Sequence, residues 1–184
     1  AERTTRERLA ALATPSLAVH GDIGDPAAIA TTLAAHGLEA ADALHVNKSV
    51  LHNRTHRPPS RHRTCPATAA VFVEPGGGFV EPDAAFGGLV ETFEAWRPLI
   101  ARHGMLAIEA HTVDPVGAAR HLGRSLVTSL DAAHGFSRQY LVEIDVHRAA
   151  AEAAGLEARA RTDLGMAMMG EPIMSIDHLM PGGR

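Results

Sequence analysis

Apolar and polar residues alternate along the first part of the chain in blocks that predict helices and strands in turn. Pro15 ends a first helical pattern, because proline cannot continue a helix. Asp25 and Pro26 have the residue types of a helix start, a capping carboxylate followed by proline at the first helical position. The predicted elements are a helix over 2–13, a strand over 16–20, a helix over 26–37 and a strand over 41–53.

The second part of the chain repeats this alternation. Two short apolar runs flank the triplet Gly76–Gly78 and predict a hairpin, because glycine accepts the positive φ of a tight turn. Residues Leu89, Phe93, Trp96 and Ile100 have the spacing of one helical face. The predicted elements are a hairpin over 68–82, a helix over 83–104, a strand over 104–113, a crossover over 114–142, a helix over 144–157, and strands over 158–164 and 171–180.

This order predicts a single α/β domain over residues 1–184, with a mostly parallel sheet and helices on both faces. In such sheets, ligands bind beyond the carboxyl ends of the strands. The residues that follow each predicted strand are therefore the first candidates for a functional site.

Composition and charge narrow the classes of function. The formal net charge of −4 provides no basic field for binding nucleic acid by counterion release. The single cysteine, Cys65, excludes an internal disulfide framework and fits a reducing compartment. No apolar run approaches the roughly 20 residues of a membrane span. We therefore expect a cytoplasmic protein that binds neither nucleic acid nor membranes.

Polar residues follow the first two predicted strands. Gly21 would let the backbone approach a ligand closely, and the Asp22 carboxylate could accept hydrogen bonds from an adenine amino group or a ribose hydroxyl. His45 lies in the second predicted strand and is a further candidate for cofactor binding. For Asp22 and Asp25, the structural alternative is a role in a turn or a helix cap.

Three histidines from different segments could meet at one rim of the sheet: His52, His111 and His134, with Gln139 near the last of them. Imidazole together with an amide oxygen favours iron or manganese over structural zinc. With twelve histidines in the chain, a surface or capping role is the alternative for each one.

Residues 54–63 contain four arginines and two histidines but no large apolar side chain, which predicts an exposed basic loop. Arginine binds carboxylate and phosphate groups in a bidentate manner, so the loop could dock an acidic carrier protein or a phosphate-bearing substrate. A solvated surface loop is the structural alternative.

Several segments resemble S-adenosylmethionine-dependent C-methyltransferases of polyketide type. These segments are VHGDIGDP, DALHVNKSVLHNR, HGFSRQY and PIMSIDHLMP. The chain is similar to the metal-dependent methyltransferase domain of the apratoxin polyketide loading module and to its stand-alone bacterial relatives. The resemblance implies a Rossmann-like class I methyltransferase sheet, apparently without its first two strands in this chain.

The resemblance also implies site residues. Asp22 and Ile23 would contact the adenine of S-adenosylmethionine, and His52, His134 and Gln139 would hold the metal. The metal, iron or manganese, would act as a Lewis acid on an acyl thioester, either small or carrier-bound. His111 would position the substrate or take a proton.

Two departures from the family pattern concern the metal. The chain has Leu51 and Arg138 where relatives carry aspartate. Two alternatives therefore stay open: a non-catalytic methyltransferase-like module that binds a partner through residues 54–63, and a metal-dependent hydrolase or decarboxylase on the same frame.

Overall fold

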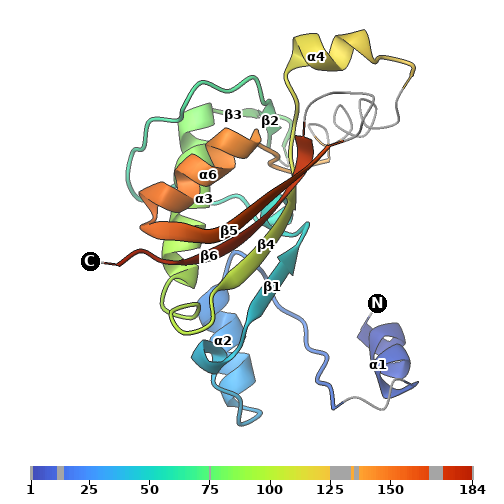
Figure 1. The fold of residues 1–184 in the computed structure, drawn as a ribbon, viewed down its shortest axis with the longest axis vertical. Coiled ribbons are helices and arrows are strands. Elements are labelled where there is room, and N and C mark those ends of the chain that lie inside the picture. The colour runs from blue at the N-terminus through green and yellow to red at the C-terminus, as the bar shows by residue number, and fades with distance from the viewer. Residues whose placement is uncertain are drawn as a thin grey trace.

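A computed structural model describes residues 2–11, 15–74, 76–124, 134, 137–165 and 172–183 (Figure 1). A four-stranded sheet has the order β1-β4-β6-β5, and a small second sheet pairs β2 with β3. The strands are β1 (His45–Lys48), β2 (Phe72–Val73), β3 (Phe79–Val80), β4 (Met105–Ala110), β5 (Leu156–Gly165) and β6 (Pro172–Pro181). The helices are α1 (Glu2–Ala11), α2 (Pro26–Ala34), α3 (Pro82–Trp96), α4 (Pro115–Arg120) and α6 (Ile144–Ala153).

The α/β class and the Rossmann-like type of the fold are confirmed, and the main sheet is mostly parallel, as expected. Strands β1, β4 and β5 point the same way, and β6 alone is reversed, antiparallel to both of its neighbours β4 and β5. The physical reason is the short connection between β5 and β6, which leaves only residues 166–171 for the return. A parallel pair needs a crossover of a dozen or more residues, whereas an antiparallel pair does not.

The strand predicted over 16–20 is also wrong. Residues 15–22 have no regular secondary structure, and Leu17 and Val19 are about two-fifths exposed. Within the described part of the chain, the only strand that pairs with β1 is β4. An apolar run without a partner strand leaves its backbone groups to water, so it does not become a strand.

Two other elements are shorter than predicted. The strand expected over 41–53 is reduced to β1, with 3₁₀ helices at Ala40–Asp42 and Leu51–Asn53 on either side. Helix α3 ends at Trp96 rather than at Gly104. The cause is Pro98, which has no N–H to donate to the Glu94 carbonyl four residues earlier, so the hydrogen-bond ladder of the helix is interrupted there.

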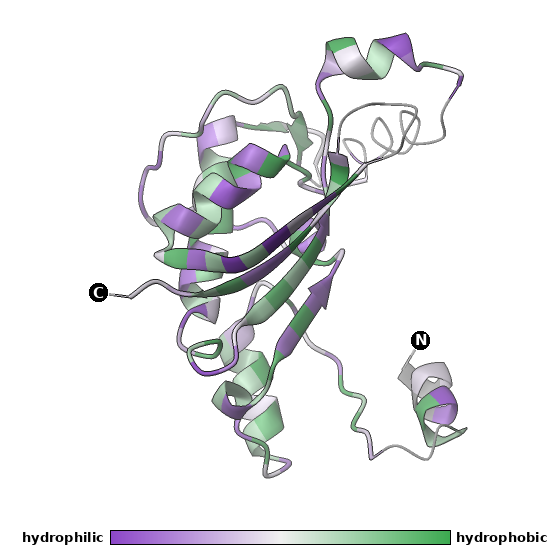
Figure 2. Cartoon of the chain, in the orientation of Figure 1, coloured by the Kyte–Doolittle hydropathy of each residue, from purple (hydrophilic) through white to green (hydrophobic). Residues whose placement is uncertain are grey.

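Helices α3 and α6 pack on the same face of the sheet (Figure 1). Their buried residues Leu89, Phe93 and Val146 belong to one core cluster with Met105 of β4 and Leu179 of β6. On the outer strand β5, polar side chains replace this apolar pattern, as the hydrophilic colours of Figure 2 show. Charged edge strands resist pairing with other chains, so β5 closes this side of the sheet.

Candidate functional site

The carboxyl ends of β1 and β4 meet because these strands are parallel. After β1, Ser49 adopts a φ of 52° and its amide donates to the Ile108 carbonyl at 2.7 Å. The chain then enters the 3₁₀ helix Leu51–Asn53 directly beside Glu109, the next-to-last residue of β4. This geometry places the sequence His-Asn-Arg at the edge where ligands bind in open α/β sheets.

Glu109 and His52 form a buried pair at this edge. Glu109 is 3% exposed and His52 is 6% exposed. The His52 Nδ1 atom lies 2.5 Å from Glu109 Oε1, and the Leu51 amide donates to Glu109 Oε2 at 2.9 Å. An ionised carboxylate only accepts hydrogen bonds, so Nδ1 carries the proton. In the neutral ring the lone pair is therefore on Nε2.

Asn53 and Gln139 adjoin His52 on the side of its Nε2 atom. The Asn53 Nδ2 atom lies 3.4 Å from His52 Nε2, and the Gln139 amide donates to Asn53 Oδ1 at 2.6 Å. The Tyr140 amide donates to the His52 carbonyl at 2.8 Å. These bonds hold the segment that carries Gln139 against the turn that carries His52.

His134 completes this group. Its ring lies edge-on to the His52 ring, with centroids 5.8 Å apart. Its Nδ1 atom is buried and has no hydrogen-bond partner among the described residues. The structure thus brings together His52, His134 and Gln139, the three residues predicted as metal ligands, and adds Asn53, which the sequence reasoning missed.

The ligand atoms of these side chains determine which metal ion the group could bind. Over the described residues, no cluster of three or more His, Cys, Asp or Glu side chains has the geometry of a metal site. The group supplies two imidazoles and side-chain amides instead. The unpartnered Nδ1 of His134 and the lone pair on Nε2 of His52 are the donor types that iron and manganese accept.

Arg54 was expected in the exposed loop and is instead 3% exposed, so this part of the expectation is wrong. Its guanidinium donates to the carbonyls of Leu51 and Ala85, both at 3.0 Å, and lies 5.6 Å from the centroid of the Tyr140 ring. Burial lowers the pKa of Arg54 to about 10. The apolar stem packs inward because the two carbonyls and the ring satisfy the charged head.

His111 lies behind the site with both ring nitrogens engaged. Nδ1 donates to the Val142 carbonyl at 3.2 Å and Nε2 lies 2.8 Å from the Ser175 hydroxyl. Burial lowers the pKa of His111, so the ring is neutral at pH 7. This arrangement joins β4, β6 and the segment at Val142, and both ring nitrogens of His111 have partners within the fold.

His147 was not predicted as a site residue. It lies on α6, is 2% exposed, and its ring packs edge-on against His111 with centroids 5.3 Å apart. Burial holds the pKa of His147 well below its usual value, and its Nε2 atom has no hydrogen-bond partner among the described residues. Together with His52, Glu109 and His111, it lines a cavity of about 10 Å³. One water molecule needs roughly that volume.

The turn predicted to bind the cofactor is internally bonded. The Asp22 carboxylate accepts from the Gly24 amide at 2.8 Å and from the Thr55 hydroxyl at 3.3 Å. The carbonyl of Ile23 accepts from Trp96 Nε1 at 3.0 Å, and Gly21 is exposed beside Ile29. The contact with Thr55 links this turn to the chain that follows the His-Asn-Arg sequence.

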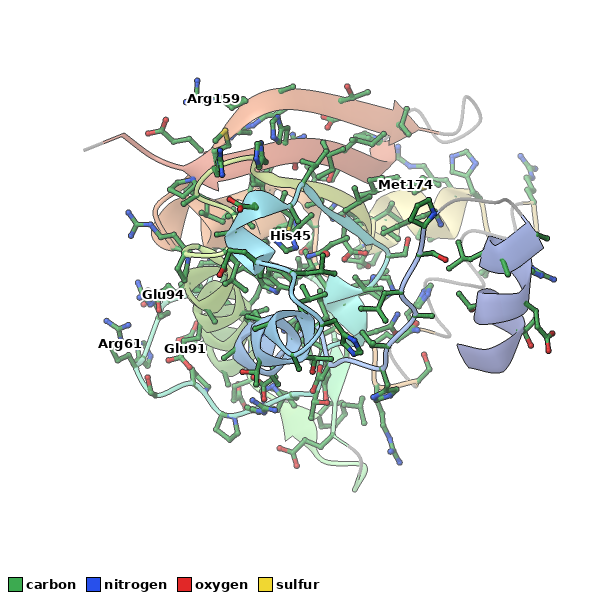
Figure 3. The ribbon with its side chains drawn as sticks, turned by 90° about the horizontal axis from the view of Figure 1, so that it is seen from below. His45, Arg61, Glu91, Glu94, Arg159 and Met174 are labelled. Carbon is green, nitrogen blue, oxygen red and sulfur yellow. The ribbon has the colours of Figure 1, made fainter. Side chains whose placement is uncertain are left out.

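His45 lies elsewhere. It begins β1, so it is at the opposite end of that strand from His52. Its Nε2 atom is 2.9 Å from the Ala40 carbonyl, and its ring packs edge-on against Trp96 with centroids 5.0 Å apart. Figure 3 shows His45 directed into the body of the domain. The structure therefore does not bring His45 to the edge that carries His52.

The rest of the 54–63 loop is tied to α3. Figure 3 shows Arg61 beside Glu91 and Glu94. Arg61 and Arg63 both bond to Glu94, at 3.1 and 2.7 Å, and Ser60 donates to Glu91. Arg61 and Arg57 remain about two-thirds exposed. The loop is thus an ordered, exposed strap whose charges are partly compensated by those of α3.

Comparison with known proteins gives a family. A methyltransferase family model described as "AprA MT2-like domain" matches residues 1–166. A search of curated proteins found no match. In the part of the chain that the structure describes, no helix is both long and apolar enough to cross a membrane.

Proposed function

The chain belongs to the AprA MT2-like domain family of methyltransferases, and from this we propose that it transfers a methyl group from S-adenosylmethionine to the activated α-carbon of an acyl thioester. In that reaction the α-carbon loses a proton and bonds to the methyl group, while the sulfur–methyl bond breaks and releases S-adenosylhomocysteine. The observation that carries the proposal is the buried Glu109–His52 pair at the carboxyl edge of the sheet.

The pair supports this chemistry because it orients a neutral imidazole toward a polar rim. His52 Nε2 is beside the Asn53 amide and the edge of the His134 ring. Carbon methylation needs the negative charge on the enolate oxygen to be stabilised as it develops. The lone pair on His52 Nε2 does not do this by itself, because it repels an oxygen anion, so His52 would contribute as a ligand of a metal that supplies the positive charge.

A divalent metal fits the donor types of this rim. His52, His134 and Gln139 would hold it, through Nε2, Nδ1 and the amide oxygen, respectively. Bound iron or manganese supplies Lewis acidity toward the enolate oxygen. The hydrogen bond from the Gln139 amide to Asn53 leaves the Gln139 oxygen as the atom available for binding, apart from a long 3.4 Å contact from Ser137.

The cofactor would lie beside the 21–23 turn. Asp22 has one carboxylate oxygen on Gly24, and its second oxygen is near Thr55 and 3.8 Å from Arg57. This second oxygen could accept a hydrogen bond from an adenine or ribose donor. The exposed side chains of Arg57 and Arg61 support docking of an acidic carrier that delivers the acyl group.

The experiment measures radioactive methyl transfer from S-adenosylmethionine to a malonyl thioester, together with manganese content by elemental analysis. We expect methyl transfer by the wild-type protein, with His134→Ala and Gln139→Ala each lowering manganese content while the protein stays folded. His36→Ala, an exposed histidine, is the matched control and should retain both properties.

Two outcomes would point to the other functions. Manganese binding without binding of S-adenosylmethionine would favour a metal-dependent hydrolase or decarboxylase. If the protein binds neither manganese nor S-adenosylmethionine, a partner-binding module would be favoured. Full manganese retention in both ligand variants would contradict the assignment of His134 and Gln139.

A further inference from the structure

We infer that Glu109 is a positioning residue that fixes the tautomer and ring orientation of His52. The inference builds on the proposed function, because it assigns His52 Nε2 to the reacting side of the site. Glu109 itself is 3% exposed and contacts His52 on the Nδ1 side of the ring, away from Nε2.

The first observation is the number of hydrogen bonds that Glu109 accepts. Oε1 accepts from His52 Nδ1 at 2.5 Å and from the Ala110 amide at 3.0 Å, and Oε2 accepts from the Leu51 amide at 2.9 Å. All three partners are donors facing a carboxylate, so the arrangement suits an ionised side chain and no other residue type. A buried charge is tolerated only when it is bonded in this way.

The second observation is that Arg54 forms hydrogen bonds with the turn on the side away from Glu109. Both backbone polar groups of Leu51 are hydrogen-bonded: its N–H donates to Glu109, and its carbonyl accepts from Arg54. Arg54 also bonds to the Ala85 carbonyl of α3, which anchors the turn to the helix layer. These hydrogen bonds fix the backbone around His52, and Glu109 makes the shortest hydrogen bond to the ring, at 2.5 Å against 3.4 Å for Asn53, so Glu109 chiefly sets the rotation about χ2.

These contacts decide which nitrogen is available. A flipped ring would place a carbon-bound hydrogen against the carboxylate and lose its short hydrogen bond. The unflipped ring keeps Nδ1 protonated and presents Nε2 to Asn53, beside His134. A carboxylate behind an imidazole fixes the tautomer and raises the basicity of the distal nitrogen.

The decisive variant is Glu109→Gln. Glutamine has one acceptor oxygen, and its amide N–H₂ would face either His52 Nδ1–H or the Leu51 amide, a donor against a donor. The matched control is Glu143→Gln. Glu143 likewise accepts from a backbone amide and a side chain, those of Ala69 and Thr68, but does not contact His52.

The first measurement is nitrogen-15 NMR of the histidine side chains in the full chain, with His52 assigned by His52→Gln. We expect the wild-type protein and Glu143→Gln to show His52 with Nδ1 protonated and Nε2 unprotonated. Glu109→Gln should show the opposite tautomer or an average of the two. Glu109→Asp keeps the charge and should retain part of the wild-type signal.

The second measurement titrates Mn²⁺ and follows binding by electron paramagnetic resonance. Loss of an outer partner of a metal-binding histidine weakens metal binding about 10- to 100-fold. We expect a loss of this size in Glu109→Gln, a smaller loss in Glu109→Asp and less than about twofold in Glu143→Gln. Unfolding curves recorded in parallel separate a loss of fold from a loss of position.

The wild-type tautomer in Glu109→Gln, with unchanged Mn²⁺ affinity, would overturn the inference. If Glu109→Gln does not fold, the same two readouts in Glu109→Asp decide, and unchanged values there would also overturn it. If the wild-type protein binds no Mn²⁺ and transfers no methyl group, the proposed function fails, while the NMR comparison still tests the role of Glu109.

Discussion

Two neutral imidazoles, those of His111 and His147, lie edge-on to each other behind the candidate site. His111 satisfies both of its nitrogens with Val142 and Ser175, whereas the Nε2 atom of His147 has no partner among the described residues. An unbonded buried polar atom costs stability, and a charged one would cost far more. Both rings therefore resist protonation, which ties the stability of the fold to pH.

The resulting prediction concerns stability below neutral pH. Burial lowers the pKa of His147 and of His111 below 6.5, so as pH falls through about 6.5 the unfolded chain takes up protons that the folded chain does not. This stabilising contribution is fully present above that pH and is lost progressively below it. For His147 the loss is at most about 2 kcal/mol between pH 7 and pH 5, the limit for a ring that stays neutral in the folded chain over that range.

Replacing His147 tests this directly. His147→Leu should reduce the fall in unfolding free energy between pH 7 and pH 5 by up to that amount, measured by urea denaturation. It should cost little at pH 7, because leucine fills a similar volume and removes the unbonded nitrogen. His36→Gln, at an exposed position, should keep the wild-type slope. The same slope in His147→Leu would contradict the assignment.

At this scale, part of the candidate site could be predicted from the sequence. His52, His134 and Gln139 were identified because they follow strand ends or lie in a family motif, and the structure does bring them together. Glu109 was missed because it sits inside a predicted strand. The signal was present: Glu109 shares the period-two face of Met105 and Ala107, and a lone carboxylate on an apolar face needs a buried partner.

Among elements, the junction before β4 depends on Gly104. Gly104 has a φ of 80°, and a Cβ atom there would lie 2.8 Å from the Leu179 carbonyl oxygen and also against the His178 ring. Gly77, in the hairpin, has a φ of 85° but open space around it. An added Cβ atom would strain the backbone at both positions but would clash with neighbouring atoms only at Gly104, so comparing the two separates these costs.

Alanine at each position measures these costs. Gly77→Ala should lower the unfolding free energy by about 1–2 kcal/mol, the cost of a left-handed conformation. Gly104→Ala should lower it by more than about 3 kcal/mol, because the Leu179 carbonyl belongs to β6 and cannot move without disturbing its pairing with β4. Urea unfolding of both variants measures the two losses of unfolding free energy. Equal losses would show that β6 shifts to make room for the added Cβ atom.

Prediction of elements succeeded where the signal is local. The hairpin β2–β3, helix α6 and the two last strands follow from periodicity and glycine placement. The strand at 16–20 failed because strand formation needs a partner, and a partner is not visible in a local pattern. The position of β6 between β4 and β5 was not predicted for the same reason: pairing is long-range.

For the whole molecule, Arg148 connects the helix layer to the sheet. It projects from α6 and bonds twice to Asp177 of β6, at 2.9 and 3.2 Å, and to Asp163 of β5. Asp177 is completely buried, whereas the Asp163 side chain is 41% exposed. The strands that follow the candidate site in the chain are thus held against α6 by a buried ion pair as well as by apolar packing.

Removing Arg148 should therefore destabilise the domain far more than removing its exposed partner. Arg148→Met leaves the Asp177 carboxylate buried without a counter-charge, which costs about 3–5 kcal/mol. Asp163→Asn should cost less than about 1 kcal/mol, because that pair is partly solvated. Adding Asp177→Asn to Arg148→Met should restore part of the loss, since the stranded charge is then gone. Thermal or urea unfolding of the three variants checks the order, and an Arg148→Met loss no larger than that of Asp163→Asn would show that apolar packing alone holds α6 on the sheet.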